Sequence, residues 1–135
     1  MNTKQWLGRA RFIDRELQAL RDARRKTFDS LTNITQNYCS DGAQTTPNPH
    51  KLDNLIELND MIDRKETELT AARLEIMAAI MQVPSGNQRA VLMAYFINGK
   101  TLEMIGVENG YSARNAQNVR NRGVRWLAEN MAEVP

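Results

Sequence analysis

The sequence has one cysteine and few aromatic residues, and each of these low numbers excludes a class of protein. The single Cys39 cannot form an intrachain disulfide, which excludes a disulfide-bonded secreted scaffold. Aromatic residues make up only 6% of the 135 residues, so the core must consist mainly of aliphatic side chains, which suits packed helices. The longest uncharged apolar run, residues 76–81, is far shorter than the roughly 18 residues that span a bilayer.

Motifs for catalysis and for cofactor binding are also missing. The sequence contains no Gly-rich phosphate loop, no paired His or Cys spacing and no nucleophile elbow. One histidine and one cysteine are too few to hold a metal ion. We therefore expect no enzymatic activity, no cofactor and no metal site. Residues 1–12 lack the apolar segment of an export signal, so we expect a cytoplasmic protein.

The net charge is only +2, but the charges are unevenly distributed. Residues 1–40 contain eight basic and four acidic side chains, whereas residues 41–84 contain four basic and eight acidic ones. These two blocks are complementary. Residues 85–135 contain six basic and four acidic side chains, and their stretch from Arg114 to Arg125 contains four arginines and no acid.

The first block has the apolar spacing of a long helix, predicted from about residue 3 to 37. Positions alternately four and three residues apart are mostly apolar: Trp6, Ala10, Ile13, Leu17, Leu20, Arg24, Thr27, Leu31, Ile34 and Tyr38. A loop is predicted at about 39–49, where turn-forming residues and two prolines follow one another.

The second block predicts another long helix, from about His50 to Gln82. Ile62, Leu69, Ile76 and Val83 recur every seven residues. Residues 1–83 are therefore expected to form an antiparallel helical hairpin that resembles a coiled coil. A turn centred near Gln44 sets the register and places Arg24 near Glu66. Such a hairpin buries little surface by itself, so we expect its open side to be covered by the C-terminal module, by a second copy of the chain, or by both. The partner expected from this is a homodimer formed through the hairpin.

Residues 84–135 form a second predicted domain with short helices and tight breaks. Ser85 or Asn87 can cap the first helix, Thr101 the second and Ser112 the third, and Gly110 suits a turn with positive φ. Helix, glycine-containing turn and helix in this order predict a helix-turn-helix DNA-binding domain.

The third helix, from Ser112 to about Trp126, carries the residue types that read DNA. Arginine can make paired hydrogen bonds to guanine, and asparagine or glutamine can make them to adenine. The predicted base-reading residues are Arg114, Asn115, Gln117 and Asn118. The predicted phosphate-binding residues are Lys100, Thr101, Ser112, Arg120, Arg122 and Arg125.

The segment from Gln88 to Leu127 resembles region 4 of sigma-70-like factors. The matching positions are Arg89, Leu92, Tyr95, Gly99, Thr101, Glu103, Ile105, Gly110 and Ser112. By this resemblance the sigma base-contacting positions fall on Ala113, Arg114, Asn115, Gln117 and Asn118. Gly106 replaces a usual alanine, and Gly123 lies inside the third helix, where glycine costs about 1 kcal/mol relative to alanine.

Three further motifs are the Ile13-Asp14-Arg15 start, the Asn48-Pro49-His50-Lys51-Leu52 helix entry and the Gly110-Tyr111-Ser112 turn. With these motifs, the whole chain resembles a family of small phage and prophage proteins that combine a helical hairpin with a sigma-region-4-like end. This resemblance implies a transcription regulator that binds double-stranded DNA, with RNA polymerase as a further partner. Two alternatives remain open: a small DNA-packaging (terminase) subunit of a phage, and a polymerase-docking module that does not bind DNA.

Overall fold

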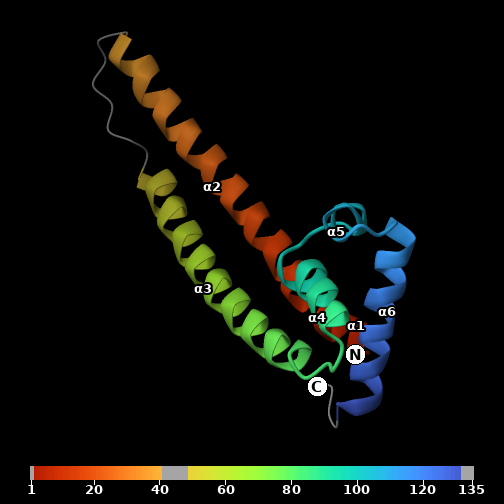
Figure 1. Cartoon of the computed structure of the whole chain (residues 1–135). Helices are drawn as coiled ribbons and strands as arrows, with labels where there is room; N and C mark the ends of the chain where they lie inside the picture. Colours follow the sequence, from red (N-terminus) through yellow and green to blue (C-terminus); the bar gives the residue numbers. More distant parts are fainter. Residues whose placement is uncertain (1, 41–48, 132–135) are drawn as a thin grey trace. The chain divides into compact units, whose positions relative to one another are not determined.

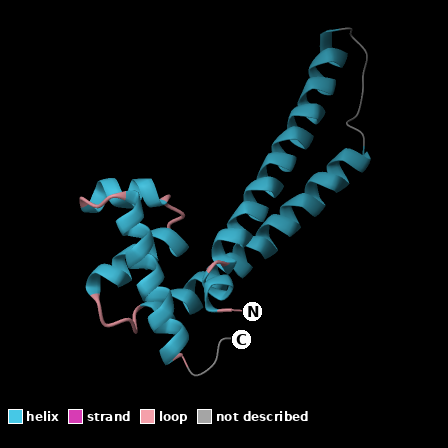
Figure 2. Cartoon of the chain, turned by 90° about the vertical axis from the view of Figure 1, so that its right-hand side faces the viewer, coloured by secondary structure: helices cyan, strands magenta, loops and turns pink. Residues whose placement is uncertain are grey.

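The protein is helical throughout the part that the structure describes. The computed structural model describes residues 2–40 and 49–131, which contain no strand (Figures 1 and 2). The helices are α1 (Thr3–Leu7), α2 (Arg9–Ser40), α3 (Pro49–Ile80), α4 (Gly86–Leu92), α5 (Leu102–Asn109) and α6 (Ala113–Asn130), and a π-helical turn, η1 (Met93–Ile97), directly follows α4. The expected all-α fold class is therefore confirmed. None of the helices in the described ranges is long and apolar enough to cross a membrane.

The first predicted helix is interrupted near its start, so the prediction of one continuous helix from residue 3 is wrong. Asn2 caps α1 by accepting a hydrogen bond from the Gln5 backbone N–H at 2.8 Å. Gly8 then ends α1 with its backbone N–H on the Lys4 carbonyl at 2.9 Å, and α2 begins at Arg9. Glycine is the poorest helix former after proline, which explains why the break occurs at this position.

The loop predicted at 39–49 is shortened at both ends in the structure, because the flanking helices extend into it. The helix α2 continues through Ser40, and α3 begins at Pro49, a residue that suits the first helical position because its missing N–H would have no partner there. Residues 41–48 lie outside the described part of the chain. The predictions for the side chains of Ile34, Tyr38 and Cys39 also lie outside it.

The chain forms two compact units. Residues Asp14–Glu68 form one unit, which we call the arm, and Met1–Ile13 together with Leu69–Pro135 form the other, which we call the base unit. The heptad positions of the second long helix are all buried: Ile62 in the arm, and Leu69, Ile76 and Val83 in the base unit. The seven-residue spacing in the sequence therefore predicts these buried positions correctly.

In the arm, α2 and α3 lie side by side and run in opposite directions (Figures 1 and 2). Lys65 Nζ lies 3.1 Å from Glu16 Oε2, and Arg21 Nη2 lies 3.0 Å from Glu66 Oε1. The basic block of the sequence therefore does meet the acidic block.

The register of the arm differs from the predicted one. Arg24 donates a hydrogen bond to Asn59 Oδ1 at 3.2 Å, whereas the prediction places it beside Glu66. The prediction assumed that the connection is centred between the helices near Gln44. In the arm, α2 extends past the beginning of α3, so opposing residues are shifted along the helices (Figure 1).

In the base unit, α4, α5 and α6 enclose a small core. Val91, Ile105 and Ala116, one from each helix, are fully buried at its centre. The predicted N-caps are present: Ser85 accepts from the Gln88 N–H, Thr101 from the Met104 N–H and Ser112 from the Asn115 N–H. Val107, near the end of α5, is 84% exposed.

Candidate nucleic-acid interface

The turn between α5 and α6 brings the two helices into close backbone contact. Gly110 ends α5 with φ +73°, a left-handed conformation that favours glycine. The next residue, Tyr111, donates its backbone N–H to the Gly106 carbonyl at 2.7 Å. A Cβ on Gly106 would lie 2.7 Å from the Tyr111 carbonyl oxygen. Glycine at position 106 therefore permits this tight turn, which an alanine would obstruct.

One side of α6 is buried and holds the helix on its neighbours. The buried positions are Ala116, Arg120, Gly123 and Leu127, which follow one another at helical spacing. Gly123 lies so close to α4 that a Cβ would be 2.7 Å from Leu92 Cδ1. The close approach of α6 to α4 leaves its other side free for solvent or a ligand.

The four predicted base-reading residues, Arg114, Asn115, Gln117 and Asn118, are all exposed in the first half of α6. Three of them, Arg114, Gln117 and Asn118, line a shallow hollow of about 550 Å³ on the α5–α6 surface. Its other lining residues are Leu102, Glu103, Ala113 and Asn121. The structure thus brings the predicted residues together on one accessible polar surface, which we call the α6 ridge.

The hollow also contains two polar residues that are not among the predicted ones. Glu103 lies in the first turn of α5, and Asn121 lies one turn after Gln117 on α6. A carboxylate in this position can accept a hydrogen bond from the amino group of cytosine. The match of Glu103 to the sigma motif marked this residue in the sequence. Its position beside the α6 ridge follows only from the packing of α5 against α6.

The predicted phosphate-binding residues fall into different environments. Arg122 and Arg125 are exposed on α6. Thr101 and Ser112 are exposed, but their hydroxyl oxygens already accept capping hydrogen bonds at 3.2 and 3.0 Å. Lys100 Nζ forms an ion pair with Glu108 Oε2 at 2.7 Å, so a phosphate would compete with that carboxylate.

Arg120 does not belong to the exposed set. Its side chain is buried, with the residue only 5% exposed, and its guanidinium lies 4.6 Å from the centre of the Tyr95 ring. The guanidinium of Arg11 lies 4.1 Å from the same ring and donates to the Tyr95 carbonyl at 2.8 Å. Two cations thus stack on one aromatic ring. Arg120 supports the core of the base unit, and the prediction that it grips a phosphate is corrected accordingly.

Within residues 2–40 and 49–131, no three His, Cys, Asp or Glu side chains are grouped so that they could hold a metal ion. Comparisons of the chain with protein-family models, with curated proteins and with solved structures found no match. The α6 ridge must therefore be interpreted from its own geometry.

Proposed function

We propose that the protein binds double-stranded DNA in a sequence-directed manner and acts as a transcription regulator of the phage or prophage type. In this proposal α5, the turn at Gly110 and α6 form a helix-turn-helix, and α6 enters the major groove. The arm is an antiparallel helical hairpin that serves self-association or contact with RNA polymerase. The resemblance to sigma region 4 supports the regulatory role.

The observation that carries the proposal is the contrast between the two sides of α6. Its inner side is buried against α4 and α5, while the ridge exposes Arg114, Asn115, Gln117 and Asn118 in the first half of the helix. Recognition helices contact base edges with residues near their N-terminus. Arginine and carboxamide side chains are the donors and acceptors that distinguish guanine and adenine there.

The phosphate contacts in the proposal come from the flanks of the ridge. Arg122 and Arg125 lie further along α6, exposed to solvent. The backbone N–H groups at the beginnings of α5 and α6, next to Thr101 and Ser112, add donors for phosphate oxygens. Lys100 contributes only if it releases Glu108. Phosphate contacts of this kind hold the protein on the duplex without reading its sequence.

The proposal predicts a division of labour between Gln117 and Arg122. Duplexes selected from a random library by the wild type would be titrated with each variant over a range of salt concentrations. Gln117→Ala should cost about 1–3 kcal/mol on the selected sequence and little on unrelated DNA. Arg122→Ala should weaken all sequences alike and lower the slope of log K against log salt by about 1. Arg64→Ala, an exposed arginine of the arm, is the control and should change neither quantity.

Three outcomes would contradict the proposal. No binding to any duplex at low salt would leave a protein-interaction module that docks without DNA. Equal effects of Gln117→Ala and Arg122→Ala on all sequences would contradict the assignment of Gln117 to base recognition and of Arg122 to phosphate binding. A ring of eight or more subunits in solution would favour a DNA-packaging subunit over a regulator.

A further inference from the structure

The arm has very few buried side chains for its length. Among its residues whose side chains are described, only Leu17 and Ile62 are buried hydrophobic residues. Four large apolar side chains of the arm are instead exposed: Phe28 by 55%, Leu52 by 40%, Ile56 by 59% and Met61 by 48%. Exposed apolar residues that gather on one surface mark an interaction site more often than scattered ones do.

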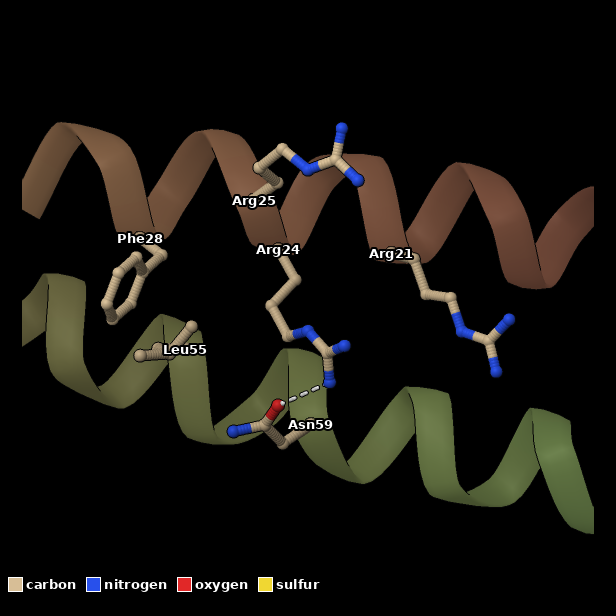
Figure 3. Close-up of a pocket in the computed structure, with 6 residues that line it drawn as sticks. All are labelled: Arg21, Arg24, Arg25, Phe28, Leu55 and Asn59. Atoms are coloured by element: carbon tan, nitrogen blue, oxygen red, sulfur yellow. Dashed lines mark hydrogen bonds between the residues drawn. The ribbon is translucent and has the colours of Figure 1, made fainter.

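On α2, the exposed side chains beside the helix contact follow one stripe. Arg21, Arg25 and Phe28 are four and three residues apart, so they lie on the same face. They line an open hollow of about 530 Å³ together with Arg24, Leu55 and Asn59. Figure 3 shows Arg24 reaching across to Asn59 and the Phe28 ring lying over Leu55, whereas the Arg25 side chain lies along α2.

On α3, a stripe of exposed side chains runs beside Leu55 and Asn59, the two α3 residues that line the hollow. Leu52 and Ile56 flank Leu55, and Asp60 and Asp63 continue the stripe at helical spacing. Both aspartates are exposed, and neither forms an ion pair or hydrogen bond through its carboxylate among the described residues. This stripe is therefore apolar at one end and carries uncompensated negative charge at the other.

The two stripes have the same order along the arm. Phe28 and Leu55 line the hollow at one level, where both helices expose apolar side chains. The hydrogen bond from Arg24 to Asn59 sets the next level, where α2 exposes basic and α3 acidic side chains. At each level, what one helix exposes is complementary to what the other helix exposes.

We propose that this face of the arm binds the same face of a second copy of the chain. A two-fold axis parallel to the arm keeps every residue at its own level and brings α2 of one copy against α3 of the other. Such an interface is isologous, so each contact occurs twice. It places Arg25 opposite Asp60 of the second copy, and Phe28 opposite Ile56 of the second copy. The dimer is argued from the arm alone; only its use on DNA rests on the proposed function.

Charge reversal tests the interface in the absence of DNA. Sedimentation equilibrium of the full chain should show a dimer for the wild type. Arg25→Glu and Asp60→Arg should each raise the dimer dissociation constant roughly tenfold or more, because like charges then meet at two symmetric places. Arg15→Glu is the matched control on α2: Arg15 is exposed, lies off the stripe and should leave the dissociation constant unchanged.

Mixing the two single variants separates contacts between copies from contacts within one chain. One copy with Arg25→Glu and one copy with Asp60→Arg restore opposite charges at both places, so the mixture should form a dimer of wild-type affinity. Phe28→Ala supplies a second, uncharged probe and should also weaken the dimer. Circular dichroism of each variant checks that its helix content is retained.

The proposal is overturned if the wild type is monomeric, if Arg25→Glu and Arg15→Glu behave alike, or if the mixture of single variants stays monomeric. A wild-type dimer that resists both charge reversals and Phe28→Ala would place the interface elsewhere. None of these outcomes depends on DNA, so failure of the dimer and failure of DNA binding are measured independently.

Discussion

At the scale of single residues, the position of α6 depends on the absence of a side chain at Gly123. A Cβ on Gly123 would lie 2.7 Å from Leu92 Cδ1 and 3.1 Å from Leu92 Cγ, and Leu92 is fully buried, so it has little room to move. From the sequence alone, Gly123 is only a weak point in a helix. In the structure it is the contact point between α6 and α4, and its helix-forming cost is offset by close packing.

This contact predicts that Gly123→Ala destabilises the protein although alanine forms helices better. Overpacking a closed core costs roughly 1–3 kcal/mol, which exceeds the gain of about 1 kcal/mol in helix propensity. Chemical denaturation measures the free energy of unfolding. Gly86→Ala is the matched control, because the nearest atom to its Cβ would be Arg89 Nη2 at 3.7 Å, and it should keep or raise stability. Equal stabilities of the two variants would contradict the role assigned to Gly123.

Arg120 shows why residue type alone misassigned one member of the site. Its charge suggested a phosphate contact, yet its position follows Ala116 by one turn on the buried side of α6. A guanidinium tolerates this burial because the Tyr95 ring offers a π face and Asn121 Oδ1 accepts from it at 3.1 Å. The partner ring belongs to a segment 25 positions away in the sequence, so spacing within α6 did not reveal it.

At the scale of secondary-structure elements, local chemistry was predictable and tertiary geometry was not. The caps at Ser85, Thr101 and Ser112 follow from side chains that satisfy nearby backbone N–H groups, and they are confirmed. The π-helical turn was not predictable in this way. Asn98 donates its backbone N–H to the Met93 carbonyl, five residues earlier, and the segment Met93–Ile97 contains no glycine or proline that would predict the change in helix type. The register of the arm likewise depends on how far α2 extends past α3, which periodicity within one helix does not specify.

The ion pairs of Lys65, one with Glu16 on α2 and one with Glu68 on its own helix α3, predict a loss of stability at alkaline pH. Hydrogen bonds from Lys65 to Glu16 and to Glu68 raise the pKa of the lysine above its usual 10.5. A group whose pKa is raised by folding stabilises the protein below its unfolded pKa, and this contribution is lost as the pH rises through the folded pKa. The stability difference between wild type and Lys65→Met should therefore be constant from neutral pH to about 9.5 and shrink above about 10.5.

Denaturation of both proteins at each pH measures this difference, and other titrating groups cancel in the comparison. Lys26→Met, an exposed lysine of the arm, is the control for the loss of one positive charge. A difference that grows above pH 10.5, or that is the same for Lys26→Met, would show that the contacts with Glu16 and Glu68 do not stabilise the arm.

At the scale of the whole molecule, the candidate site was predictable where it lies on one helix. Exposure of Arg114, Gln117 and Asn118 follows from the amphipathic pattern of α6. The pattern of α6 could not predict Glu103, because Glu103 lies on α5. It lines the hollow only because α5 and α6 pack closely at Gly106. A surface assembled from two elements requires their packing to be known.

The two proposals together predict how the dimer occupies DNA. Two copies carry two α6 helices, and each must meet the major groove, which returns to the same side of the duplex about every 10–10.5 base pairs. The selected DNA should therefore contain two half-sites one helical turn, or a multiple of it, apart. Arg25→Glu should lose affinity for the double site while its affinity for an isolated half-site is unchanged, because the substitution lies in the arm and leaves α6 intact.

Fluorescence anisotropy on duplexes with one or two half-sites measures both affinities. The mixture of Arg25→Glu and Asp60→Arg chains should recover the affinity for the double site, since it restores the opposite charges between copies. Inserting half a helical turn between the half-sites should abolish the advantage of the double site, because the second groove then faces away. If Arg25→Glu binds both duplexes as the wild type does, the arm does not couple the two recognition helices, whatever the oligomeric state of the free protein.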